Sequence, residues 1–291
     1  MKQIELKALA KINLGLGGLG RRENGYHDVR MIMQSVYLYD DVVIVRKDLP
    51  GIEVETNLHF LPTDENNIAY KAAAMLMEEF KLPGGVRIVL NKHIPVAAGM
   101  AGGSSNAAAV LFGMNKMFRL GLSQRSLMER GVRLGADVPY CIMRGTVLAE
   151  GIGEELTTLP ALPACTVLIA KPPISVSTKV VYEALDAKEI VDHPDIDGII
   201  RGLETGSLSE IAAHMGNVLE DVTIGMYPVI EKIKDEMKKA GALNAMMSGS
   251  GPTVFGIFES RAAARRAQEQ IRRKALAKQV YVTNVHGARR T

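Results

Sequence analysis

Apolar and polar positions follow two periods along the chain, one typical of strands and one typical of helices. In the N-terminal half, alternation and β-branched runs predict a strand at 6–16, one or two strands at 31–45, a strand at 86–95 and a strand with a hairpin at 146–159. Apolar residues at helical spacing predict helices in the same half at 67–80, 105–120 and 123–134. The N-terminal half therefore mixes both kinds of element.

The sequence changes character near Pro160, where LPALPACTVLIAKPP holds four of the twelve prolines. We expect a domain boundary there, with an N-terminal domain at 1–160 and a C-terminal domain at 161–291. In the second domain we expect a strand at 165–170, helices at 227–240 and 260–275, and strands at 243–248, 252–258 and 279–285. Strands and helices alternate without a regular βαβ rhythm, so the predicted fold class is α+β.

Composition narrows the class of protein. The hydrophobic fraction of 47% and the charged fraction of 23% are those of a globular protein with an ordinary core. A net charge of +3 is too small to argue for nucleic acid. Two cysteines cannot build a disulfide framework or an all-cysteine metal site. No apolar run approaches the length of a membrane span, so we expect a cytoplasmic protein that does not bind membranes.

The chain has two glycine clusters that could approach a phosphate. The first, Gly15 to Gly20, matches G-x-G-x-x-G, but a dinucleotide site also needs a helix that opens from the glycines. Here the glycines lead into RRENGYHD and a further β-rich segment. We therefore interpret this cluster as a flexible turn between strands.

The second cluster, PVAAGMAGGSSNAAA at 95–109, lies between a predicted strand and a predicted helix. Glycines let the backbone turn and let a ligand approach, and Ser104, Ser105 and Asn106 stand where N-cap residues are expected. Free N–H groups and the helix dipole would then face an anion. The missing G-K-[ST] excludes a Walker A loop. The alternative is a glycine-rich helix start that only packs against a sheet.

The pattern P-x-x-A-G-x-A-G-G-S-S-N-A-A resembles the phosphate-binding motif of the GHMP kinases, which include galactokinase, homoserine kinase, mevalonate kinase and phosphomevalonate kinase. Five further segments are similar to the GHMP branch that phosphorylates a cytidine-diphosphate derivative of methylerythritol: AKINLGL at 10–16, GRRENGYHDV at 20–29, MQSV at 33–36, LGADVPY at 134–140 and SGSGPTVF at 248–255. Asn24 and Met100 depart from the residues expected there, and both suit their positions chemically. Residues 186–215 match no motif, and we assign them no role.

The resemblance implies a two-domain kinase, with an N-terminal domain like the second domain of ribosomal protein S5 and a ferredoxin-like C-terminal domain. It implies transfer of the γ-phosphoryl group of ATP to the 2-hydroxyl of the cytidylated substrate, a step of the non-mevalonate route to isoprenoid precursors. ATP is then the co-substrate and Mg²⁺ accompanies it. The expected partner is this small molecule, the chain being a monomer or weak homodimer that does not bind nucleic acid.

The same resemblance assigns the site residues. Asp137 is the catalytic base, with Lys11 beside it to stabilise negative charge. Residues that contact the substrate are Asn13, Tyr26, His27 and Thr178, of which Tyr26 stacks on cytosine and His27 hydrogen-bonds it. Residues that hold ATP are Pro95, Val96, Ala97, Ala98, Gly99, Met100, Ala101, Gly102, Gly103, Ser104, Ser105, Asn67 and Lys92. Ser105 is also a candidate Mg²⁺ ligand.

Other interpretations stay open from the residues alone. Asp137 before Pro139 is also a common turn former, and Lys11 could lie at a sheet edge with its ammonium in water. Another GHMP kinase acting on homoserine or a mevalonate derivative, or a related decarboxylase, would lack the base-recognising Gly-Tyr-His. An RNA-binding module with the S5-like fold predicts a continuous basic face. We interpret the basic segment 264–274 as a solvated helix face.

Overall fold

The computed structural model describes residues 1–21, 27–186 and 193–287, which form two compact units. Unit 1 comprises Met1–Ala10, Leu38–Val96 and Ala101–Arg144. Unit 2 comprises Lys11–Tyr37, Ala97–Met100 and Gly145–Thr291. Two long strands, β1 (Gln3–Arg21) and β2 (His27–Lys47), run through both units. These two units do not coincide with the predicted domains at 1–160 and 161–291. The domain boundary at residue 160 stays a prediction.

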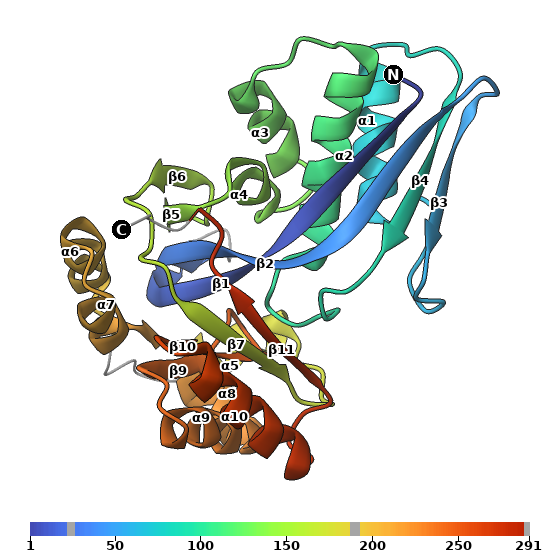
Figure 1. Ribbon diagram of the computed structural model, residues 1–291. Coiled ribbons are helices and arrows are strands. Elements are labelled where there is room, and N and C mark those ends of the chain that lie inside the picture. Colours follow the sequence, from blue (N-terminus) through green and yellow to red (C-terminus); the bar gives the residue numbers. More distant parts are fainter. Residues whose placement is uncertain (22–26, 187–192, 288–291) are drawn as a thin grey trace. The chain divides into compact units, whose positions relative to one another are not determined.

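Unit 1 is a sheet covered by helices. The strands β3 (Gly51–Thr56) and β4 (Gly85–Asn91) pair in parallel, and β4 pairs antiparallel with the second half of β2. Helices α1 (Ile68–Glu79) and α2 (Gly102–Phe118) lie side by side against these strands (Figure 1). A Cβ at Gly113 of α2 would lie 2.6 Å from Ile44 Cδ1, so only glycine allows this close approach. Helices α3 (Gln124–Val132) and α4 (Val138–Met143) complete the unit.

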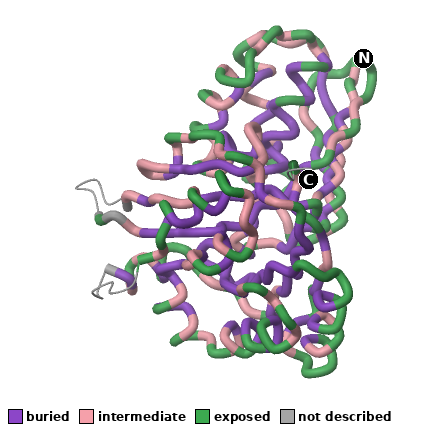
Figure 2. The backbone as a smooth tube through the Cα atoms, turned by 60° about the vertical axis from the view of Figure 1, so that its left-hand side comes forward, coloured by how far each residue is buried: buried purple, intermediate pink, exposed green. Residues whose placement is uncertain are grey.

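Unit 2 contains a four-stranded antiparallel sheet in the order β11-β7-β10-β9. Its strands are β7 (Thr166–Lys171), β9 (Asn244–Met247), β10 (Val254–Phe258) and β11 (Gln279–Asn284). Helices α9 (Val229–Lys239) and α10 (Arg261–Arg273) supply apolar residues to its core, including Ile233 and Ile271. Strands β7, β9 and β10 consist almost entirely of buried residues, and Figure 2 marks buried residues in purple and exposed residues in green along the backbone. This strand order confirms the predicted ferredoxin-like sheet.

Smaller elements of unit 2 pair with or follow the C-terminal part of β1 and the N-terminal part of β2, which belong to this unit. Strand β5 (Thr146–Glu150) pairs antiparallel with β2 and with β6 (Glu155–Thr158), as the predicted hairpin requires. The two-residue strand β8 (Gly216–Asn217) pairs in parallel with β1. Between β7 and α9 the described part of the chain forms four short helices: α5 (Thr178–Asp186), α6 (Ile196–Thr205), α7 (Leu208–His214) and α8 (Glu220–Met226).

The first glycine cluster lies inside strand β1, so the prediction of a turn there is wrong. A Cβ at Gly15 would lie 2.6 Å from Ile196 Cδ1 and 2.7 Å from Ile199 Cδ1. The glycine thus lets helix α6 pack directly on the strand. Arg30 of β2 holds the same helix through two bonds to the Asp197 carboxylate, of 2.8 and 3.1 Å.

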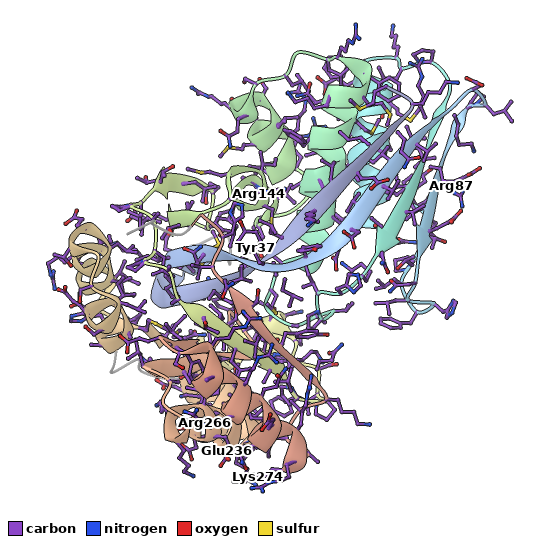
Figure 3. All side chains as sticks on the ribbon, viewed as in Figure 1. Tyr37, Arg87, Arg144, Glu236, Arg266 and Lys274 are labelled. Atoms are coloured by element: carbon purple, nitrogen blue, oxygen red, sulfur yellow. The ribbon has the colours of Figure 1, made fainter. Side chains whose placement is uncertain are left out.

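The basic helix α10 carries charged side chains on its exposed face. Figure 3 shows Arg266 on this helix and Lys274 beside Glu236, and the Lys274 ammonium lies 2.7 Å from the Glu236 carboxylate. Among the described residues, no helix is both long enough and apolar enough to cross a membrane.

Candidate functional site

The second glycine cluster does precede a helix, but the helix begins earlier than the sequence predicts. Helix α2 starts at Gly102, and its N-cap is Ala101 in the left-handed conformation (φ 55°, ψ 31°). Ser104, Ser105 and Asn106 therefore lie inside the helix, and their prediction as N-caps is wrong. The reason is that the chain already turns through left-handed residues at Ala97, Gly99 and Ala101.

No side chain caps helix α2, and its first turn holds no acidic residue. By contrast, Asn67 caps α1 and Ser123 caps α3 through side-chain oxygens. The first N–H groups of any α-helix lack intrahelical acceptors. At α2 these groups and the positive end of the dipole are consequently left for an anionic ligand.

Three other segments of unit 1 border the start of α2. A Cβ at Gly102 would lie 3.4 Å from Lys92 Nζ, and a Cβ at Gly103 would lie 3.5 Å from Ile68 Cγ2. A Cβ at Gly135 would lie 3.9 Å from Ser104 Oγ. The end of β4, the start of α1 and the turn before α4 thus meet around one helix terminus.

Asp137 lies in the last of these segments. It occupies the N-cap position of α4, with Pro139 in the first turn, and is half-buried. Its carboxylate does not cap the helix, and no described residue of unit 1 donates a hydrogen bond to it. The short helix α4 was missed by the sequence analysis, which predicted only a turn. Within the described part of unit 1 the carboxylate thus has no hydrogen-bond donor, and its function as the catalytic base stays a prediction.

Lys92 lies in a buried polar network. Its ammonium donates to the carboxylate of Asp40 and, at 2.6 Å, to Asn106 Oδ1. Asp40 is fully buried and also accepts from Asn106 Nδ2 at 2.9 Å and from the N–H groups of His93 and Ile94 at 2.7 and 2.8 Å. This network fixes the end of β4 to the beginning of α2. Lys92 is thus held by protein partners, while its contact to ATP stays a prediction.

The sequence analysis missed Asp40. Its signal was an acid inside the apolar run VYLYDDVVIV, where an ionised side chain needs a buried partner.

Asn67 has a local structural function. Its Oδ1 accepts from the N–H of Ala69 at 2.9 Å, and its Nδ2 donates to the carbonyl of Pro62 at 2.7 Å. Its contact to nucleotide stays a prediction.

In unit 2, Lys11 and Asn13 form a buried pair on β1. Lys11 is 5% exposed, which excludes the interpretation of a solvated edge lysine. Its ammonium donates to Asn13 Oδ1 at 2.7 Å, and no carboxylate of the described part of unit 2 pairs with it. Asn13 Nδ2 in turn lies 3.3 Å from the sulfur of Met31. A buried ammonium with one neutral acceptor retains capacity for an anionic partner.

The SGSG turn packs against the loop residues that belong to unit 2. Ser248 Oγ donates to the carbonyl of Gly99 at 2.9 Å. Gly99 has φ 69°, and a Cβ there would lie 2.1 Å from the carbonyl oxygen of Ser248. A Cβ at Gly249 would lie 3.6 Å from Asn13 Oδ1. Gly249 and Gly251 both have positive φ, which a tight turn of the backbone requires here.

Two successive carbonyls of the loop are held in place. Ser248 Oγ bonds the Gly99 carbonyl, and the N–H of Lys11 donates to the Met100 carbonyl at 3.2 Å. In a planar trans peptide the carbonyl of one residue and the N–H of the next point in opposite directions. The N–H groups of Met100 and Ala101 are thereby turned away from these partners, as in backbone nests that bind anions.

The remaining predicted substrate residues are described only in part. Thr178 begins α5, and its hydroxyl lies 2.8 Å from that of Ser250 in the SGSG turn. Tyr26 lies outside the described residues. His27 begins β2, and its side chain is not described.

The described ranges contain no group of three or more His, Cys, Asp or Glu side chains that could hold a metal ion. Ser105 is buried in the first turn of α2. Its function as a ligand to Mg²⁺ stays a prediction.

Comparisons with known proteins agree with this arrangement. The model of the GHMP kinases N terminal domain matches residues 67–145, and that of the GHMP kinases C terminal matches residues 199–278. The first match spans α1, the glycine loop, α2 and Asp137, so the class defined by fold and loop is that of the GHMP kinases. A homoserine kinase structure from Cytophaga hutchinsonii shares the fold (TM-score 0.79, 21% identity, 99% of this chain and 96% of that chain).

Closer relatives narrow the class. The 4-diphosphocytidyl-2-C-methyl-D-erythritol kinases of Lachnospira eligens and Lachnoclostridium phytofermentans are 58% and 54% identical, each over 97% of this chain and over 98% and 97% of their own length. The crystal structure of a 4-(cytidine 5'-diphospho)-2C-methyl-D-erythritol kinase matches with TM-score 0.84 and 32% identity, over 98% of this chain and 100% of that chain. The chain belongs to the 4-diphosphocytidyl-2-C-methyl-D-erythritol kinase family, within the GHMP kinases.

Proposed function

We propose that this chain transfers the γ-phosphoryl group of ATP to the 2-hydroxyl of 4-diphosphocytidyl-2-C-methyl-D-erythritol and releases ADP. The observation that carries the proposal is 58% identity to a kinase of that name over 97% of the chain. The product would serve the non-mevalonate route to isoprenoid precursors. We place the reaction in the cytoplasm, with the chain as a monomer or weak homodimer.

ATP would place its phosphates on the loop at 95–105. The uncapped start of α2 and the N–H groups of Met100 and Ala101 support this position, because they offer several donors to one anion. Phosphoryl transfer depends mostly on positioning and on stabilising charge, which fixed backbone donors supply without reorganisation. Mg²⁺ would accompany ATP and neutralise phosphate charge, with Ser105 as its candidate protein ligand.

Asp137 would accept the proton of the 2-hydroxyl as the new O–P bond forms. Its carboxylate has no partner in the described part of unit 1, and its turn borders the start of α2. Lys11 would stabilise negative charge on the attacking oxygen and the transferred phosphoryl group. Burial with a single neutral acceptor supports this assignment, since such an ammonium interacts strongly with an anion.

The cytidine base would be recognised by Tyr26 through stacking and by His27 through hydrogen bonds. Asn13 would orient the acceptor, and Thr178 would contact the substrate beside the SGSG turn. These assignments come from the family resemblance of Gly25-Tyr26-His27.

The direct test is ADP release from Mg-ATP in the presence of 4-diphosphocytidyl-2-C-methyl-D-erythritol, with homoserine and mevalonate as parallel acceptors. We expect release that depends on the cytidylated acceptor alone. Release with homoserine or mevalonate instead would reject the proposed substrate and keep the kinase. In the same assay Asp137→Asn should lower kcat by about 10²–10⁴-fold, the usual contribution of a general base, with ADP affinity unchanged. Substantial residual turnover would remove Asp137 from this function.

A further inference from the structure

Two polar residues of unit 2, Asn217 and Glu220, take part in none of the assignments above. They lie three residues apart, Asn217 at the end of the two-residue strand β8 and Glu220 at the start of α8. Both direct their side chains at the backbone of the strand end and turn at Met247–Gly249.

Both donors and the oxygen of the Asn217 side-chain amide form hydrogen bonds with backbone groups. Its Nδ2 donates to the carbonyls of Met247 and Gly249, at 2.9 and 2.8 Å, and its Oδ1 accepts from the N–H of Leu219 at 3.0 Å. The residue is 7% exposed. One buried amide thus joins both sides of Ser248 to strand β8, which itself pairs with Gly15 and Leu16 of β1.

Glu220 holds the same backbone from its other side. Its Oε1 accepts from the N–H of Met247 at 2.5 Å, and its Oε2 accepts from Lys234 at 2.8 Å. Burial raises the pKa of the Glu220 carboxyl, and the Lys234 ammonium opposes that effect. Both the N–H and the carbonyl of Met247 are therefore bonded by side chains from the 217–220 segment.

The residue between these anchored groups is Ser248, whose hydroxyl bonds the Gly99 carbonyl at 2.9 Å. That bond sets the plane of the peptide group that carries the Met100 N–H. A shift of the turn would rotate this donor away from its direction or break the bond.

We propose that Asn217 and Glu220 are positioning residues for phosphate binding: they hold the SGSG turn so that Ser248 fixes the direction of the Met100 N–H. The inference rests on the proposed function, because it requires that the loop binds nucleotide phosphates. It assigns neither residue a contact with substrate.

The test compares a ligand with phosphates and one without. Asn217→Asp keeps the size and the acceptor but replaces both donors by an oxygen that faces two carbonyls. We expect the Kd of Mg-ADP to rise about tenfold, because two buried amide-to-carbonyl hydrogen bonds are replaced by repulsion between oxygens that displaces the turn, while the Kd of adenosine changes less than about twofold. Calorimetry would measure Mg-ADP and ligand-observed NMR would measure adenosine. Glu220→Gln, which retains an acceptor for the Met247 N–H, should lie close to the unsubstituted chain.

The matched control is Asn115→Asp. Asn115 is equally buried and also bonds backbone with both amide atoms, at 2.9 and 3.0 Å to Leu122, but it lies near the other end of α2. We expect it to leave both affinities unchanged. If Asn217→Asp does not fold by circular dichroism, Ser248→Ala removes only the final hydroxyl and should give the same phosphate-dependent loss.

The outcomes separate the inference from the proposed function. Equal weakening of Mg-ADP and adenosine, or no weakening of Mg-ADP, overturns the inference. An unsubstituted chain that binds Mg-ADP but does not phosphorylate the cytidylated acceptor fails the proposed function, and the Asn217→Asp comparison still decides the inference. An unsubstituted chain that binds no Mg-ADP overturns both.

Discussion

The two glycine-rich segments of this chain differ in what surrounds them. Around Gly15 the neighbours are apolar: a missing Cβ makes room for Ile196 and Ile199 of helix α6. Around Gly99 the neighbours are polar backbone and side chains: the Ser248 carbonyl and hydroxyl, and the N–H of Lys11 at the next residue. In the first segment glycine allows a helix to pack closely on the strand. In the second segment glycine allows the left-handed turn that orients the backbone N–H groups.

A glycine pattern alone therefore does not identify a phosphate-binding loop. The first segment satisfies G-x-G-x-x-G and remains a strand, whereas the second lacks that pattern and ends in an uncapped helix. The feature that separates them is the fate of the backbone N–H groups. In the first segment the N–H groups belong to a paired strand. In the second segment the N–H groups at the start of α2 have no capping side chain and are left for a ligand.

Gly99→Ala should have the largest effect. The left-handed φ of 69° costs an alanine about 1–2 kcal/mol. A Cβ 2.1 Å from the Ser248 carbonyl adds an overpacking cost of about 1–3 kcal/mol. Since both costs fall on the loop, we expect turnover and Mg-ADP affinity to fall about a hundredfold or more.

Gly121→Ala is the control for Gly99→Ala. Gly121 also has a left-handed φ, of 71°, but a Cβ there would meet no atom within 4 Å. It should lower stability by about 1 kcal/mol and leave Mg-ADP binding unchanged. If Gly99→Ala binds Mg-ADP like Gly121→Ala, the Ser248 contact does not shape the loop.

Asp40→Asn tests the polar network that holds the other end of the same loop. The substitution leaves the Lys92 ammonium buried without a carboxylate, which should lower the free energy of unfolding by about 3–5 kcal/mol in denaturant titrations. Asp41→Asn is the matched control, because Asp41 is 45% exposed and its partner is His93 at 3.5 Å. It should change stability by less than about 1 kcal/mol. Equal effects at the two positions would show that the network contributes little.

Much of the fold could be predicted because most helices and strands show the spacing of apolar residues that is typical of their type. The helices at 68–79, 102–118, 229–239 and 261–273 and the hairpin at 146–158 lie within a few residues of their predicted limits. Helix α4 was not predicted, because it has six residues, too few to show a helical period, and Pro139 in its first turn resembles a turn signal. Helices α6 and α7 occupy a segment without a recognisable motif, in which Gly198 and Gly202 of α6 allow a close approach to His214 and Ile211 of α7.

The site could be predicted only where chemistry is local. The loop, Lys11 and Asp137 follow from motifs, whereas Asp40 and Asn217 gain their function from partners 52 and 30 residues away. A buried polar side chain is informative only when its acceptor is known, and one sequence does not supply that acceptor.

Gly15→Ala should have a moderate effect confined to stability. A Cβ 2.6 and 2.7 Å from two isoleucine methyl groups requires those flexible ends to move, at a cost of about 1–3 kcal/mol. Thermal unfolding would measure this loss, and Mg-ADP affinity should stay the same. A pronounced loss of Mg-ADP affinity at unchanged stability would contradict the assignment of the first cluster to packing alone, because it would place that cluster in the nucleotide site.

Ala101→Gly should have the smallest effect. Ala101 adopts the left-handed conformation at the N-cap of α2, so glycine relieves about 1 kcal/mol of backbone strain. Glycine also adds about 0.4–1 kcal/mol of conformational entropy to the unfolded chain, which offsets most of that gain. We therefore expect a rise in the free energy of unfolding below about 1 kcal/mol, measured in denaturant. Ala275→Gly is the control, since Ala275 has a similar φ of 54° but follows helix α10. A gain at Ala275 with a loss at Ala101 would mean that the loop requires alanine's restricted backbone to keep its N–H groups aligned.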